Sequence, residues 1–111
     1  GILLQGIPVR MAILNNIIAN FAAGIKTTGT PSSIISAAGN VLVDNVTGIE
    51  LTNNGSTLIS GNTISKSASY GSSEYSIRIS GTGKGLVSSN LILGKDADVV
   101  SSVTKVNNKW Q

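Results

Sequence analysis

The hydrophobic and polar positions of this chain form a short phrase that recurs four times. Each phrase begins with an asparagine and places an apolar residue two positions later, and successive phrases start 24, 22 and 28 residues apart. A period of roughly 20–30 residues built from strand-like phrases is typical of stacked supersecondary units, not of one compact globule. The asparagines that open the phrases are Asn16, Asn40, Asn62 and Asn90.

Further apolar columns emerge when the four repeats are aligned on these asparagines. One apolar column lies three positions before the asparagine, a second lies two positions after it, and a third follows nine positions after it in three repeats. In the repeat that begins at Asn62 the third position comes six residues later, which indicates an insertion at residues 66–75. The columns are Ile13, Ala37, Ile59 and Val87; Ile18, Leu42, Ile64 and Ile92; and Ile25, Ile49, Ile77 and Val99.

The columns predict three short strands in each repeat, every strand giving one or two apolar residues to a shared interior. The connections are too short for the crossover helix of a βαβ unit, which takes about a dozen residues or more. We therefore expect an all-β parallel solenoid of about four to five coils, in which each strand pairs with the strand one repeat away. It forms a single domain over residues 1–111, with 1–12 as an entry segment and 101–111 as a terminal cap.

The asparagine column has a structural explanation in such a solenoid. Like residues in successive coils lie about 4.8 Å apart. Stacked asparagines can pass side-chain amide hydrogen bonds from coil to coil, and asparagine tolerates the left-handed backbone of a sharp corner. We interpret Asn16, Asn40, Asn62 and Asn90 as a structural ladder and not as a ligand site.

Two segments allow a second interpretation. Residues 11–25 also place apolar side chains at the i, i+3, i+4 and i+7 spacing of an amphipathic helix. The segment lacks a good N-cap and contains three asparagines, so the repeat register favours strands, with a short capping helix as the alternative. Trp110, the only tryptophan, is predicted to cover the last coil, with a sugar-stacking platform as the alternative.

Composition excludes several classes of function. The chain has no cysteine and no histidine, which removes the commonest metal ligands and the commonest general base, so no metal or cofactor is expected. Charged residues make up only 12%, the net charge of +3 is dispersed, and few aromatic residues are available to stack on bases, which argues against a nucleic-acid partner. No apolar run is long enough to predict a membrane span. The opening residues lack the charged region of a signal peptide, and we interpret them as a cut within a longer polypeptide.

The residues that flank the apolar position after each asparagine should point outward, because side chains alternate along a strand. In three of the four repeats these outer positions are apolar, which favours burial against copies of the same chain. The predicted interface residues are Ile17, Val41, Val43, Leu91 and Leu93. A second outer column, Lys26, Glu50 and Arg78, alternates in sign and is predicted to form cross-strand ion pairs at the surface.

The phrases Gly48-Ile49-Glu50-Leu51-Thr52 and Ser60-Gly61-Asn62-Thr63-Ile64, together with the asparagine column, carry a family resemblance. Over about residues 6–106 the chain resembles the right-handed parallel β-helix of pectate-lyase-like proteins, and within them the phage tailspike and tail-fibre group. The resemblance implies a side-by-side homotrimer that binds, and in many members cuts, bacterial surface polysaccharide. Only the ladder role carries over to residues of this chain, since no catalytic motif of the family is present.

Candidate chemistry is confined to a few residues. Glycoside hydrolysis needs two carboxylates about 5–10 Å apart. Asp96 and Asp98 are close in sequence, but a charged stretch between strands is typical of a solvated turn. The Lys66–Tyr75 insertion is the better candidate, because Tyr70, Glu74 and Tyr75 could stack on a sugar and hydrogen-bond to it. A loop that only packs against another subunit, or is only solvated, is the alternative.

The repeats, together with what the family resemblance implies, lead to three functional hypotheses. The first is a non-enzymatic, trimeric part of a phage tail spike or fibre, located in the virion tail, which supports adsorption to bacterial surface polysaccharide. The second is a piece of a secreted polysaccharide-degrading hydrolase or lyase whose carboxylates come from neighbouring chains. The third is the passenger of an extracellular adhesin.

Overall fold

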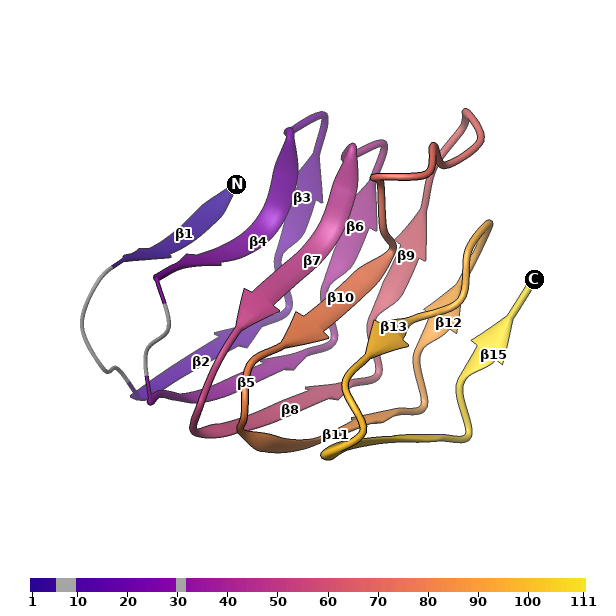
Figure 1. Cartoon of the computed structure of the whole chain (residues 1–111). Helices are drawn as coiled ribbons and strands as arrows, with labels where there is room; N and C mark the ends of the chain where they lie inside the picture. The colour runs from indigo at the N-terminus through magenta and orange to yellow at the C-terminus, as the bar shows by residue number, and fades with distance from the viewer. Residues whose placement is uncertain (6–9, 30–31) are drawn as a thin grey trace.

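The computed structural model describes residues 1–5, 10–29 and 32–111, and within these ranges the chain forms fifteen strands and no helix. Accordingly, none of the described residues belongs to a helix that could cross a membrane. The strands form three sheets that the chain visits in turn, so that one coil of the solenoid takes one strand from each sheet (Figure 1). This confirms the predicted all-β parallel solenoid, with about four turns.

Each sheet contains five parallel strands. Sheet A consists of β1 (Ile2–Gln5), β4 (Ala23–Thr28), β7 (Thr47–Thr52), β10 (Ile77–Ser80) and β13 (Asp98–Val99). Sheet B consists of β2 (Arg10–Leu14), β5 (Ile34–Ala38), β8 (Ser56–Ser60), β11 (Lys84–Ser88) and β14 (Val103–Val106). Sheet C consists of β3 (Ile17–Ala19), β6 (Val41–Val43), β9 (Thr63–Ser65), β12 (Leu91–Ile92) and β15 (Lys109–Trp110).

The register places the predicted columns side by side. Ile25 pairs with Ile49 and Ile49 with Ile77 in sheet A, while Leu42 pairs with Ile18 and Ile64 in sheet C. Residues 11–25 contribute to β2, β3 and β4, so the strand interpretation is confirmed and the capping helix is wrong. Residues 6–9 of the entry segment lie outside the described residues.

The core is the common interior of the three sheets. Members of all three predicted columns are buried, and Ile25, Leu42, Ile49, Ile59 and Ile92 have no exposed surface. Burying a side chain of this size stabilises the fold by about 1.5–3 kcal/mol. The branched side chains suit the pleated inner surfaces, which explains why each coil repeats them.

Two of the corners differ in how regular they are. The corner between sheets B and C has two residues in every coil, from 15–16 to 107–108, and the first of the two always has a positive φ between 54° and 66°. The left-handed conformation that we expected of the ladder asparagines therefore belongs to the residue before each of them, namely Asn15, Gly39, Gly61, Ser89 and Asn107. The corner between sheets C and A varies instead, through residues 20–22, 44–46, 66–76 and 93–97.

The end of the chain continues the repeat. Within the predicted cap, β14 pairs with β11 and β15 pairs with β12, in the same register as the earlier coils. Trp110 is the partner of Ile92, so it extends the inner column of sheet C while 54% of its surface stays exposed. This position suits a residue that covers the last coil.

Candidate functional site

The predicted ladder asparagines form a single file of hydrogen bonds at the B–C corner. The Oδ1 atom of Asn62 accepts hydrogen bonds from the backbone N and from Nδ2 of Asn40, both at 2.9 Å. The Nδ2 atom of Asn62 donates to the Ala37 carbonyl and to Oδ1 of Asn90, both at 3.0 Å. Asn16 donates to Oδ1 of Asn40 in the same way. The ladder amides of Asn40, Asn62 and Asn90 are buried and use their bonds within the chain, which leaves little capacity for a ligand.

The ladder extends one coil beyond the four repeats read from the sequence. Asn108 accepts from the backbone N and from Nδ2 of Asn90 at 3.1 and 2.9 Å, and its Nδ2 donates to the Val87 carbonyl at 2.9 Å. The sequence signal was present, because Asn108 precedes the short strand β15 as the other asparagines precede theirs. Only 18 residues separate Asn90 from Asn108, and this short interval concealed the repeat.

The predicted interface residues on the outer face of sheet C differ in exposure. Ile17 is 82% exposed and Val41 is 37% exposed. Val43, Leu91 and Leu93 are half-buried, and the polar residues Thr63 and Ser65 lie in β9 between them. The large apolar exposure on this face is therefore concentrated in β3 and β6.

The insertion at the C–A corner folds back on the neighbouring coils. It projects between β9 and β10 at the top of Figure 1. Lys66 forms an ion pair with Oε2 of Glu74, which also accepts a hydrogen bond from the Gly71 backbone N at 3.0 Å. From the next coil, Lys95 donates to the Gly71 and Glu74 carbonyls at 3.2 and 2.7 Å. From the preceding coil, Asp44 accepts hydrogen bonds from the backbone N and the hydroxyl of Ser67 at 2.6 and 3.1 Å.

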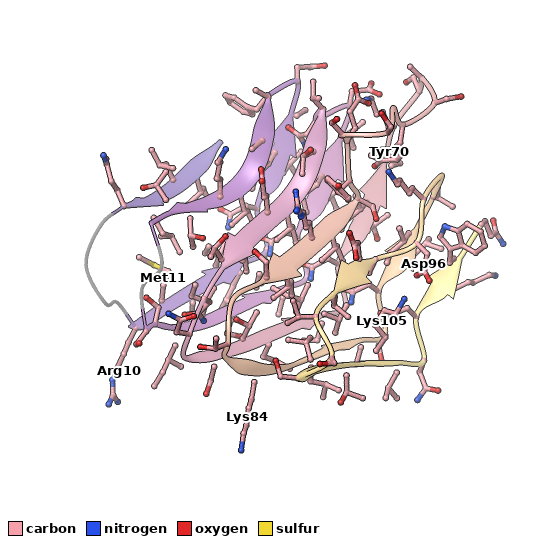
Figure 2. The ribbon with its side chains drawn as sticks, in the orientation of Figure 1. Arg10, Met11, Tyr70, Lys84, Asp96 and Lys105 are labelled. Carbon is pink, nitrogen blue, oxygen red and sulfur yellow. The ribbon has the colours of Figure 1, made fainter. Side chains whose placement is uncertain are left out.

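Both tyrosines of the insertion lie against cations. The Lys66 ammonium is 5.1 Å from the ring centroid of Tyr70, which is labelled below the projecting loop in Figure 2. The Arg78 guanidinium and the Lys95 ammonium lie 4.7 and 4.6 Å from the ring centroid of Tyr75. Cation–π contacts of this kind fix the orientation of a ring.

The same contacts set the charges of the site. The ion pair with Lys66, and then the Gly71 N–H, lower the pKa of Glu74 below its usual value. Hydrogen bonds from Ser67, first from its backbone and then from its hydroxyl, lower the pKa of Asp44. Burial raises the pKa of Tyr70, with smaller contributions from Glu74 and Asp44. At neutral pH the Asp44 and Glu74 carboxylates are therefore ionised and the Tyr70 phenol is neutral.

The remaining carboxylates do not gather around this loop. Asp96 forms an ion pair with Lys105 at 2.9 Å, and both residues are labelled in Figure 2. Asp98 is the register partner of Arg78 and so continues the charged column of sheet A, in which Lys26 and Glu50 are 3.5 Å apart. Among the described residues no group of three or more acidic, histidine or cysteine side chains could hold a metal ion.

Sequence reasoning placed Tyr70, Glu74 and Tyr75 in one loop but did not find the residues that hold it. Asp44 and Lys66 each follow a ladder asparagine by four positions, so extending the alignment by one column brings them together. Lys95 occupies nearly the same place in the next repeat. Arg78 was identified only as a member of the charged column of sheet A.

Comparison of the chain with protein-family models, with curated proteins and with solved structures finds no match. The resemblance seen in the sequence is therefore supported as far as the parallel solenoid itself, which is compatible with a β-helix.

Proposed function

We propose that this chain is a rigid, non-enzymatic part of a phage tail spike or tail fibre, and that its Lys66–Tyr75 loop contacts bacterial surface polysaccharide. The observation that carries the proposal is the loop itself. It is the place where the described chain departs most from its repeat, and the departure brings together two tyrosines, three cations and an ionised carboxylate.

The chemistry of the loop suits a polyhydroxylated ligand. Lys66, Lys95 and Arg78 offer hydrogen-bond donors, ionised Glu74 offers acceptors, and each tyrosine combines an apolar ring with a polar tip. The loop is held by hydrogen bonds to the coils on either side. A loop that is already ordered loses less conformational entropy when a ligand binds.

Binding without cleavage is supported by the state of the carboxylate. A general acid must hold its proton near neutral pH, which requires a raised pKa. The pKa of Glu74 is lowered, because Lys66 and the Gly71 N–H stabilise its charged form. Ionised Glu74 therefore does not suit the role of general acid in glycoside hydrolysis, which supports a glycan-binding role for the loop.

The solenoid supplies the mechanical part of the proposal. Three sheets that hydrogen-bond from coil to coil form a stiff shaft, which suits the exterior of a virion. In this role the chain assembles side by side as a homotrimer, with Ile17, Val41, Val43, Leu91 and Leu93 contributing to the contact between copies.

The test is calorimetric titration of the chain with a panel of capsular polysaccharides and lipopolysaccharide glycans. For a glycan that binds, Tyr70→Ala and Tyr75→Ala are expected to weaken affinity at least about tenfold, since stacking on an aromatic ring is worth about 1.5 kcal/mol. Thr28→Ala, on the distant outer face of sheet A, is the matched control and should bind as the unchanged chain does. Equal affinity of all three variants, or release of reducing ends from the glycan, would contradict the proposal.

A further inference from the structure

The outer face of sheet B exposes a large aliphatic side chain on every strand. Their exposed fractions range from 38% to 51%. Most of the other outward positions are occupied by alanine, serine or threonine, and the two charged ones by Arg10 and Lys84, which point away from the solenoid in Figure 2. The exposed residues, in strand order, are Leu14, Ile34, Leu58, Leu86 and Val106.

The charges of the molecule lie mostly on another side. All five acidic residues belong to sheet A or to the C–A corner: Asp44, Glu50, Glu74, Asp96 and Asp98. Sheet A presents a charged outer column, as a solvated face does. Sheets B and C have no carboxylate on their strands, and the corner between them carries the uncharged column Asn15, Gly39, Gly61, Ser89 and Asn107.

Apolar exposure continues across this uncharged corner. Leu14 ends β2 and Ile17 begins β3, and they are 51% and 82% exposed. In the next coil Val41 of β6 is exposed beside Ile17. Exposed aliphatic side chains therefore flank the edge where sheets B and C meet, which we call the B–C edge. An apolar surface of this extent marks an interaction site in a soluble protein.

We propose that the B–C edge is the surface through which copies of this chain associate, with their solenoid axes parallel. The inference rests on the proposed side-by-side assembly and specifies which faces make it. A partner must match rows of side chains that repeat about every 4.8 Å. A second copy aligned along the same axis has this spacing in every row, so each exposed aliphatic residue meets a coil of the second copy at its own height.

Charge and area agree with this assignment except at the last coil, where exposed Lys109 in β15 is the register partner of Leu91. Arg10 and Lys84 lie at the start of their strands, on the side of sheet B away from the corner, so their charged ends can remain in water at the rim. The outer faces of the five strands of sheet B and the five of sheet C, which meet at the corner, together cover about 600 Å² at standard strand dimensions. This is on the scale of the roughly 800 Å² that each partner buries in a standard interface.

The first test is the molar mass in solution, measured by light scattering and sedimentation from about 1 to 100 μM. We expect the unchanged chain to be oligomeric. The double variant Leu58→Lys/Leu86→Lys and the single variant Val41→Lys should each raise the dissociation constant of the oligomer at least 100-fold. Val46→Lys is the matched control, because Val46 is 44% exposed but lies at the C–A corner. A cooperative melting transition for each variant shows that its fold is intact.

A second test does not depend on disrupting the contact. The chain has no cysteine, so Ser88→Cys introduces a single thiol beside the B–C edge and Thr28→Cys introduces one on sheet A. Under mild oxidation with glutathione disulfide, we expect covalent dimers from Ser88→Cys and essentially none from Thr28→Cys.

The outcomes separate the two proposals. An unchanged chain that stays monomeric at 100 μM overturns both the side-by-side assembly and the B–C edge. An oligomer that survives the lysine variants, or that cross-links equally at both cysteines, overturns the B–C edge alone. A dimer disrupted by the edge variants supports the B–C edge and contradicts the trimer.

Discussion

The B–C corner and the C–A corner turn the same chain through the same solenoid, but they tolerate very different sequences. The B–C corner takes two residues in every coil, and the second is always a ladder asparagine, which is buried at Asn40, Asn62 and Asn90. The C–A corner ranges from three residues at 20–22 to eleven at 66–76. A corner whose asparagine amides bond to the asparagines of the coils above and below must keep its length, whereas a corner without such a ladder is free to acquire a loop.

The difference has a physical cause in where the polar groups find their partners. At the B–C corner a buried amide must meet the amide of the adjacent coil, and an unsatisfied buried donor costs about 1–3 kcal/mol. At the C–A corner the insertion supplies its own ion pair between Lys66 and Glu74, and side chains such as Asp44 and Lys95 bond to it from the adjacent coils. A ligand-binding loop is therefore expected at the C–A corner, where the asparagine ladder is absent, and not at the B–C corner.

The largest expected effect comes from lengthening each corner by one residue. A glycine inserted between Gly61 and Asn62 displaces a ladder amide or shifts the following strand by one residue, which turns its inner side chains outward. We expect a loss of more than about 4 kcal/mol in the free energy of unfolding, or no folded protein. A glycine inserted between Ser72 and Ser73 should cost less than about 0.6 kcal/mol, because only loop closure changes. Urea denaturation of both variants measures the contrast, and similar losses would remove the distinction between the corners.

The next largest effect on the free energy of unfolding is expected from removing one ladder amide. Asn62→Ala leaves the Asn40 amide groups and the Ala37 carbonyl without their partner in the buried centre of the ladder. We expect a destabilisation of about 3 kcal/mol. Asn16→Ala, at the partly exposed end of the ladder, is the control and should cost about 1 kcal/mol. Equal urea midpoints for the two variants would show that burial of the ladder does not determine its contribution.

Substitutions at the left-handed position of the B–C corner should change the stability of the fold by a smaller amount. Gly61 has a φ of +63°, and a side chain added there meets no atom within 4 Å, so a substitution tests backbone conformation alone. Gly61→Val should cost about 1–2 kcal/mol, because β-branched residues resist this conformation. Gly61→Asn should be close to neutral, since Asn15 and Asn107 occupy the same position in other coils. Thermal melting of the pair ranks them, and the opposite order would be inconsistent with the observed backbone.

The smallest effect concerns the C–A loop and its pH dependence. The pKa of Glu74 is lower in the folded chain than in the unfolded chain, so its charged form stabilises the loop above the unfolded pKa of about 4.3. This contribution is lost as the pH falls through the folded pKa. Glu74→Gln should therefore lower the melting temperature slightly at pH 7, and the difference should shrink as the pH falls below the unfolded pKa. A difference that grows as the pH falls would contradict the assigned ion pair.

The fold was predictable because its main interactions repeat at one spacing along the chain. The repeated apolar position at Ile25, Ile49 and Ile77 predicts a shared interior, and each ladder asparagine indicates a corner. The hydrogen-bond partners at irregular positions could not be predicted in the same way. Asn45 bonds to Ile18 and Phe21, and Asn53 to Ser33, through contacts that occur once and leave no periodic signal.

The candidate site was predictable only in part. The Lys66–Tyr75 loop shifts the third apolar column by six residues, so Tyr70, Glu74 and Tyr75 could be recognised in the sequence as exceptions to the repeat. The position of Lys95 over Tyr75 could not, because it depends on how the loop folds back across a coil. The apolar outer face of sheet B was also missed. Its aliphatic residues come from columns that mix with serine and alanine, so no single column of the alignment is apolar throughout.

Nuclear magnetic resonance of the asparagine side chains tests the central claim, the vertical superposition of residues some two dozen positions apart, most directly. We predict that the Nδ2 protons of Asn40, Asn62 and Asn90 exchange slowly with solvent and show through-space contacts to the next asparagine along the ladder. Rapidly exchanging amide protons at random-coil shifts, with no contact between successive asparagines, would contradict the account.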